Sequence, residues 1–180
     1  MPAMEITGAP PPWLQAGLTI RTAGRMILAG LIGGFLGEAF LGALFGNSFT
    51  QSILYDPALQ SPLFIQMTTQ RDFPLSIAGL IVLSVIHSAL YAVLAPALPG
   101  RTWIGKGLFW GLTIWLMYWV FQEWFIYHTL FREPLILCMM ELSFLLIGSC
   151  IEGLAIAFLL RERTEMNAIN ALSKAPSTTG

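Results

Sequence analysis

The chain has 180 residues and a formal net charge of −1, with 56% hydrophobic and only 11% charged residues. A soluble domain carries about 25% charged residues, so this composition excludes an ordinary water-exposed surface. It favours an integral membrane protein with one compact domain, whose main partner is the lipid bilayer. The charge balance gives no basic surface, and we therefore expect no nucleic-acid partner.

Four segments are apolar over a length that can cross about 30 Å of hydrocarbon. They are expected at residues 26–45, 75–98, 104–126 and 135–160. Together they predict an all-α fold, a four-transmembrane-helix bundle in one domain over residues 26–160. A Pro-rich lead precedes it at residues 1–25, and a polar tail follows at 161–180. The first apolar core is longer than the roughly 7–15 residues of a signal peptide and contains Glu38, so we expect a retained span.

Proline residues mark where the second and fourth spans begin. Pro74 and Pro134 lie near the first helical turn, where a missing N–H costs nothing, and Pro99-Gly100 is expected to end the second span. The long loop over residues 46–73 mixes apolar and polar residues. We expect it to form one or two short helices at the exterior surface of the bilayer. The alternative is that this loop caps the bundle.

The basic residues predict the orientation. Seven of them lie on one side of the four-span arrangement: Arg21, Arg25, Arg101, Lys106, Arg161, Arg163 and Lys174. Only Arg71 and Arg132 lie on the other side. Because segments rich in lysine and arginine stay in the cytoplasm, both termini are expected to be cytoplasmic.

Small residues recur at a spacing of four in the first and third spans. Gly33-x-x-x-Gly37 and Gly107-x-x-x-Gly111 allow helices to approach closely in lipid, where packing drives association. The pattern predicts a tight bundle. It also leaves open a homodimer or a larger membrane-protein partner.

Five ionisable residues fall inside the predicted spans: Glu38, His87, Glu123, Glu141 and Glu152. A charged carboxylate at the bilayer centre costs about 2.5–3.5 kcal/mol, so such side chains normally face the bundle interior, water or a partner. Glu38 and His87 lie near the middle of their spans. Because the third and fourth spans run in opposite directions, Glu123 and Glu141 share a layer about 10 Å toward the exterior.

Helical spacing gathers these residues on common faces. Glu141 and Glu152 are eleven residues apart, which places them within about 20° of each other on the fourth helix. The second span has a polar face that combines His87 with Ser84, Ser88 and Tyr91. Gln122 lies beside Glu123. These faces predict an ion or proton path through the interior. The alternative is that the carboxyl groups are only hydrogen-bonded, structural residues.

The sequence lacks short catalytic and cofactor motifs. It has no H-E-x-x-H, no G-x-S-x-G and no G-x-x-x-x-G-K, so a non-enzyme is favoured and no cofactor or metal is expected. A membrane enzyme using Glu123 and Glu141 as acid and base would escape this search. Glu123 and His128 are five residues apart, about 140° around an α-helix, unlike the Glu-x-x-His of a di-iron bundle. Cys138 and Cys150 lie about 18 Å apart along one helix, too far for a disulfide, and are expected in the core.

His87-x-x-x-Tyr91, followed by Gly107-x-x-x-Gly111-x-x-x-Trp115, resembles small four-helix inner-membrane proteins of bacteria that remain uncharacterised. The likeness covers the second to fourth spans. It implies a multi-pass bundle in the bacterial inner membrane. It implies no activity, and it carries over no catalytic residue.

Two functional classes follow from these patterns. In the first, the chain handles protons, small ions or solutes through a polar interior lined by glutamate and histidine. In the second, it is a non-catalytic accessory or structural subunit of a larger membrane complex, and basic residues of a partner meet its carboxylates. Carboxylates that face inward favour the first class, whereas an outward Glu38 or Glu123 favours the second.

Overall fold

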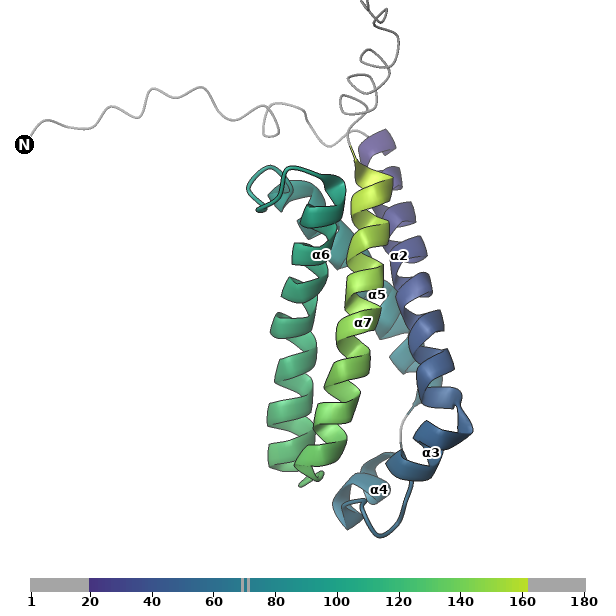
Figure 1. The fold of residues 1–180 in the computed structure, drawn as a ribbon. Helices are drawn as coiled ribbons and strands as arrows, with labels where there is room; N and C mark the ends of the chain where they lie inside the picture. Colours follow the sequence, from purple (N-terminus) through teal and green to yellow (C-terminus); the bar gives the residue numbers. More distant parts are fainter. Residues whose placement is uncertain (1–19, 69, 71, 162–180) are drawn as a thin grey trace, which may run out of the picture.

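Residues 20–68, 70 and 72–161 are described by the structure, a computed structural model, and within these ranges the chain is helical without a β-strand. In chain order the elements are α2 (Ile20–Gly46), α3 (Ser48–Leu54), α4 (Pro62–Thr68), α5 (Phe73–Leu94), α6 (Trp103–Ile114), the π-helices η1 (Trp115–Trp119) and η2 (Gln122–Leu130), and α7 (Leu135–Leu160) (Figure 1). Four stretches are long and apolar enough to cross a membrane: Ala23–Gly46, Phe73–Leu94, Trp103–Leu130 and Leu135–Leu160. The expectation of an all-helical chain with four possible spans is confirmed.

The helices end at different residues from the approximate expected spans in two places. The second span ends at Leu94, with Ala95 as its C-cap, and not at residue 98. Pro96 explains the early end, because it has no N–H to donate and its ring disfavours a continuing helix. The third span continues to Leu130 instead of ending at 126, and Phe131 still donates its N–H to the Ile126 carbonyl at 3.0 Å.

The third span also changes its helical type halfway. It is α-helical up to Ile114 and contains π-helical turns in η1 and η2. A π-helix bonds residues five apart, and π-helical turns are frequently found at functional sites. The angle of about 140° expected between Glu123 and His128 therefore does not apply, because it assumed α-helical geometry.

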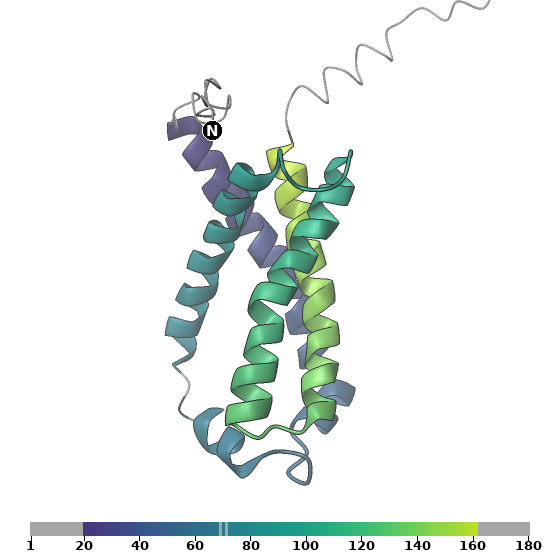
Figure 2. The ribbon, with the colours of Figure 1, turned by 90° about the vertical axis from the view of Figure 1, so that its left-hand side faces the viewer.

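The bundle is arranged around α7. This helix packs against α6, η1 and η2 on one side and against α2 on another, and α5 packs mainly on α2 (Figures 1 and 2). The start of α2 and the end of α7 lie at the same end of the molecule, where the Arg25 guanidinium donates to the Leu159 carbonyl at 3.3 Å. The short helices α3 and α4 lie at the opposite end. We call these the termini end and the loop end.

Glycines determine how closely the helices approach. A Cβ atom on Gly33 would lie 2.9 Å from Ile156, and one on Gly37 would lie 3.0 Å from the Gly148 carbonyl oxygen. On the other side of α7, a Cβ atom on Gly107 would lie 3.0 Å from Leu154 Cα, and one on Gly111 would lie 2.6 Å from Cys150 Cα. These backbones are therefore in direct contact, as small residues permit in lipid.

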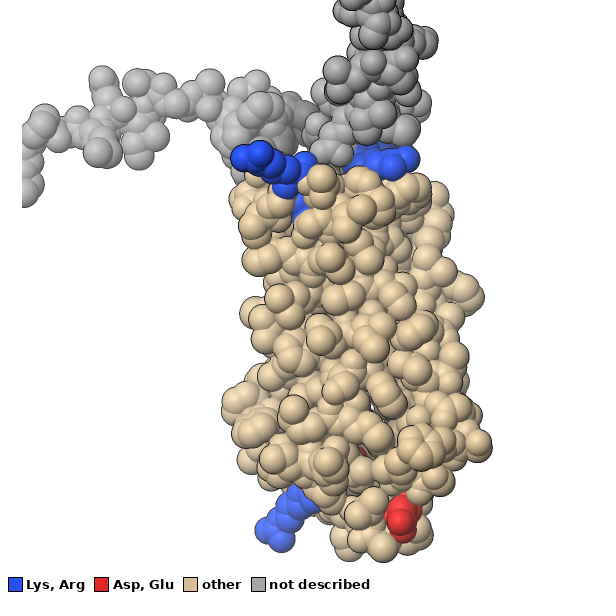
Figure 3. All heavy atoms as spheres, in the orientation of Figure 1, with Lys and Arg blue, Asp and Glu red and all other residues tan. Residues whose placement is uncertain are grey.

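The surface is strongly apolar, and the interior contains polar as well as apolar side chains. Large apolar side chains are widely exposed, with Phe35 at 72% and Met117 at 76%. Buried positions include many polar side chains: Ser84, His87, Ser88, Glu123, Glu133, Ser149 and Glu152. On the face shown in Figure 3, the wide middle band carries almost no charged side chain. An apolar exterior around a core that includes buried polar groups is consistent with an integral membrane protein.

Basic side chains gather at the termini end. Arg25 and Lys106 lie near the starts of α2 and α6, Arg101 lies just before α6 and Arg161 just after α7, and Figure 3 shows basic residues at that end. Arg132 lies in the η2–α7 connection at the loop end. The side chain of Arg21, and all of Arg71, Arg163 and Lys174, lie outside the described residues.

The long loop forms two short helices, and it contacts the bundle. Asn47 caps α3 by accepting a hydrogen bond from the Thr50 N–H at 2.9 Å. Ser61 is buried and donates its hydroxyl to the Phe131 carbonyl at 2.6 Å. The Phe64 ring packs edge-on against Tyr127. The loop is thus anchored on the end of η2.

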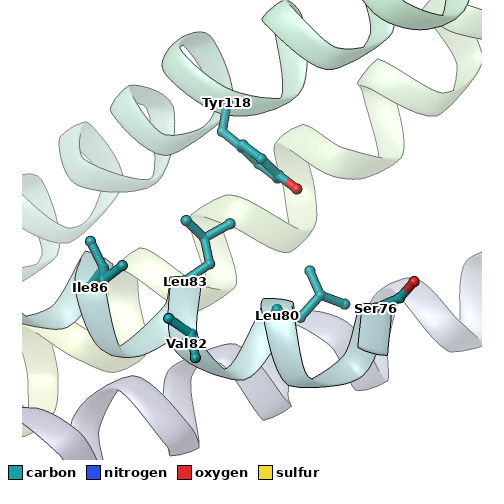
Figure 4. A pocket seen from close by; sticks show the side chains of 7 residues that line it. Ser76, Leu80, Val82, Leu83, Ile86 and Tyr118 are labelled. Atoms are coloured by element: carbon teal, nitrogen blue, oxygen red, sulfur yellow. The ribbon is translucent and has the colours of Figure 1, made fainter. Parts of the chain in front are cut away.

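A lateral groove separates α5 from the third span. Near the termini end the two meet, where Tyr91 and Trp110 pack edge-on with ring centroids 6.0 Å apart. Toward the loop end they diverge and leave an open groove of about 360 Å³. Figure 4 shows its lining residues: Ser76, Leu80, Val82, Leu83, Ile86 and Tyr118. The groove is lined mainly by apolar side chains, so lipid acyl chains suit it as occupants.

Candidate functional site

Two separate groups of polar side chains lie inside the bundle. The first group joins α5 to α7, where His87 Nδ1 and Glu152 Oε1 are 3.0 Å apart. We call it the His–Glu pair. Ser88 lies on the same face of α5 and donates its hydroxyl to the Met26 carbonyl at 2.7 Å. Ser84 donates to the Leu80 carbonyl at 3.0 Å within its own helix.

Close packing of α2 encloses the His–Glu pair. A Cβ atom on Gly33 would lie 3.2 Å from the Glu152 carbonyl oxygen, and one on Gly37 would lie 3.4 Å from Glu152 Cβ. On the other flank of α2, a Cβ atom on Gly30 would lie 2.7 Å from the backbone of Ser84. The α2 backbone therefore packs directly against Glu152 and Ser84, and both members of the pair are buried.

The second group lies nearer the loop end, and Glu123 is its centre. This side chain is only 1% exposed, and its Oε2 atom has no hydrogen-bond partner among the described residues. The Glu141 carboxyl group and the Gln122 amide are its polar neighbours. Trp115 fixes the third span to α7 in this region by donating its indole N–H to the Leu142 carbonyl at 2.8 Å.

Two residues that the sequence did not single out as site residues join this group. Glu133 and Cys138 are each 1% exposed, and Cys138 Sγ lies 3.6 Å from Glu133 Oε2. One potential ligand atom from each of Glu123, Glu133 and Cys138 lies within 4.8 Å of the others. We call Glu123, Glu133, Cys138 and Glu141 the loop-end cluster.

The tight connection between η2 and α7 places Glu133 inside. Its N–H donates to the Tyr127 carbonyl at 3.0 Å, and its own carbonyl lies 2.8 Å from His128 Nδ1. Arg132, just before it, adopts a left-handed backbone conformation with φ 57°. Such conformations in residues other than glycine are strained and tend to occur at functional sites.

Replacing Arg132 tests this connection. We expect Arg132→Gly to be more stable than Arg132→Ala by about 1 kcal/mol, because a left-handed backbone disfavours any Cβ. Both variants lose the same charge, so their difference isolates the backbone. The free energy of unfolding in mixed detergent micelles measures it. Equal stability of the two variants contradicts a left-handed Arg132.

The loop-end cluster buries several acidic groups close together, so negative charge there is costly. No lysine or arginine forms a salt bridge with it in the described part of the chain. Burial raises the pKa of the Glu133 carboxyl group, outweighing the nearby Cys138 thiol and His128 ring, which act to lower it. A buried carboxylate without a cation is costly, so this cluster favours a bound proton or a bound cation.

The predicted site residues are thus divided between two places. Glu141 and Glu152 lie about 16 Å apart along α7, and the apolar side chains of Leu142 and Leu145 are buried between them. Glu38 is half-buried. It follows Gly37, which contacts Gly148 on α7, so Glu38 lies at a depth between those of Glu141 and Glu152. The structure pairs His87 with Glu152 and brings Glu123 beside Glu141.

No family model, curated protein or solved structure matches the chain. The function is therefore argued from these two groups of side chains. Sequence reasoning missed Glu133 because Glu133-Pro134 was interpreted only as a helix start. It missed Cys138 because a lone cysteine in an apolar helix is usually a core residue. The available signal was that Cys138 and Glu141 are three residues apart, and hence neighbours on one helical face.

Proposed function

We propose that this chain is an integral membrane protein that handles protons or small cations through its buried carboxyl groups and histidine. The observation that carries the proposal is Glu123, which lies within an apolar span, is 1% exposed and keeps one carboxylate oxygen without a partner among the described residues. Placing such a group in a membrane costs several kcal/mol. Ionisable residues inside membrane spans commonly mark ion pathways or proton relays.

The proposed location is the bacterial inner membrane, with both termini in the cytoplasm. The concentration of basic side chains at the termini end supports this orientation. The loop-end cluster then lies near the exterior surface, beneath the loop that contains α3 and α4. The His–Glu pair lies deeper and closer to the cytoplasm. Protons or cations from the exterior would meet the loop-end cluster first.

A second candidate is a non-catalytic accessory or structural subunit. It is favoured by Gly42 and Gly46, because a Cβ atom on either would have nothing within 4 Å. This open small-residue flank of α2 suits a second membrane helix, from another copy or from a larger partner. The inward positions of Glu123 and Glu152 favour ion handling instead, since a partner's basic residues would have to enter the bundle to reach them.

Flux through liposomes tests the first candidate. We expect Glu123→Gln to slow protein-dependent dissipation of a pH gradient at least tenfold. A side-chain amide does not ionise, so it cannot release and rebind a proton as a carboxyl group does. Asp72→Asn is the matched control. It makes the same chemical change at an exposed helix cap, where asparagine and aspartate cap equally well. Unchanged flux in Glu123→Gln, with a wild-type rate above that of empty liposomes, rejects Glu123 as part of the path.

A further inference from the structure

We propose that Glu123, Glu133 and Cys138 form a binding site for one divalent transition-metal ion of the zinc type. The residues come from η2, from the η2–α7 connection and from α7, so three consecutive parts of the chain converge on one point. The proposal goes beyond the proposed function, because a bound ion requires no flux across the membrane.

The distances between the potential ligand atoms suit a single ion. Zinc binds carboxylate oxygen at about 2.0–2.2 Å and thiolate sulfur at about 2.3 Å, so tetrahedral ligand atoms lie about 3.5 Å apart. The atoms of Glu123, Glu133 and Cys138 lie within 4.8 Å of one another. For one ion to bind all three atoms, their separations must shorten by at most about 1.3 Å.

Two carboxylate oxygens without hydrogen-bond partners support a bound cation independently of the ligand distances. Glu123 Oε2 and Glu133 Oε1 are both buried and have no hydrogen-bond partner among the described residues. Leaving a buried polar atom without a partner costs about 1–3 kcal/mol, and more for a charged group. A cation between the two carboxylates satisfies both oxygens at once.

The chemistry of the ligand atoms selects the class of ion. Magnesium and calcium prefer only oxygen ligands, whereas a thiolate beside carboxylates suits zinc or a similar transition metal. With both carboxylates and the thiol ionised, the three groups carry three negative charges in a buried place. A divalent cation neutralises most of this charge. Glu141 interacts electrostatically with all three residues, so it is available as a fourth ligand.

Groups around the site hold the ligands in place. The His128 ring contacts the Glu133 carbonyl at 2.8 Å, and the Trp115 indole fixes the third span to α7. Such outer contacts orient metal ligands and tune affinity. The site lies at the loop end, where α4 is linked to η2 through Phe64 and Tyr127. The long loop therefore lies close to the route by which an ion would enter.

Cobalt and zinc loading of the purified full chain tests the proposal, with any affinity tag removed. We expect the wild type to retain about one Zn²⁺ per chain after free metal is removed. Co²⁺ should produce a thiolate-to-cobalt absorption band. Cys138→Ser should abolish the band, and Glu133→Gln should weaken binding at least tenfold. Cys150→Ser is the matched control and should change neither result, because Cys150 lies outside the cluster.

A second measurement needs no variant, so it decides the question even where Cys138→Ser fails to fold. X-ray absorption at the zinc edge of the wild type should show one sulfur and two or three oxygen ligands. Absence of bound zinc, a shell without sulfur, or a cobalt band that survives Cys138→Ser overturns the proposal. Bound zinc without flux leaves the metal site standing and rejects the proposed ion handling. Flux without bound metal rejects the metal site and leaves the proposed ion handling standing.

Discussion

Replacing Gly153 by alanine is expected to destabilise the bundle by about 2–3 kcal/mol. The added Cβ atom would lie 2.6 Å from Gly111 N and 2.8 Å from Gly111 Cα, and closer still to the Gly107 carbonyl oxygen. All three are backbone atoms, which cannot rotate away as a side chain would. Relief therefore requires α6 and α7 to separate. Overpacking of a well-packed core costs about 1–3 kcal/mol, occasionally more.

Gly42→Ala is the matched control and should have the opposite sign. It also lies within a membrane-length helix, but a Cβ atom there has nothing within 4 Å. Alanine is favoured over glycine in a helix by up to about 1 kcal/mol, so this variant should be slightly more stable than the wild type. Unfolding by sodium dodecyl sulfate in mixed micelles, followed by circular dichroism, measures both. A Gly153→Ala variant as stable as the wild type contradicts the close contact of α6 and α7.

Removing one partner of the His–Glu pair is also expected to destabilise the bundle strongly. His87→Leu leaves Glu152 buried without its 3.0 Å contact. Breaking a buried pair in this way costs about 3–5 kcal/mol, because the remaining polar group stays buried without its partner. Glu152→Leu alone should also destabilise, since it leaves His87 without that contact.

The double variant His87→Leu with Glu152→Leu distinguishes pairing from two independent effects. Replacing both members of a buried pair by apolar residues is often neutral, so we expect the double variant to recover most of the stability lost in His87→Leu. The same unfolding titration gives the coupling energy, which is the sum of the two single losses minus the loss in the double variant and is expected at about 3 kcal/mol or more. Purely additive losses would show that the two residues do not depend on each other.

The helical spans could be predicted because their signals are local. The fourth span begins at Leu135 and ends at Leu160, as apolar length and Pro134 indicated. The second span ended early because Pro96 stops the helix before Pro99-Gly100 is reached. The π-helical turns of the third span have no comparable sequence signal. Trp115, the first residue of η1, donates its indole N–H to the Leu142 carbonyl of α7, a tertiary contact that the sequence does not reveal.

The candidate site could be predicted only where depth and helical face were sufficient. Counting residues along antiparallel spans was enough to place Glu123 and Glu141 in one layer. It could not pair His87 with Glu152, because helix rotation and tilt depend on packing. Glu133 was missed for a different reason. Its inward position depends on the left-handed turn at Arg132, and an arginine is an uncommon residue for that conformation.

The central claim is that the carboxyl groups inside the bundle handle protons or small cations. The most direct measurement is the collapse of an imposed pH gradient in liposomes, reported by a trapped pH-sensitive dye. Wild-type protein is reconstituted at several protein-to-lipid ratios and compared with empty liposomes. If these carboxyl groups handle protons or cations, the rate rises with the amount of protein. A rate equal to that of empty liposomes at every ratio, with no dependence on added metal cations, contradicts it.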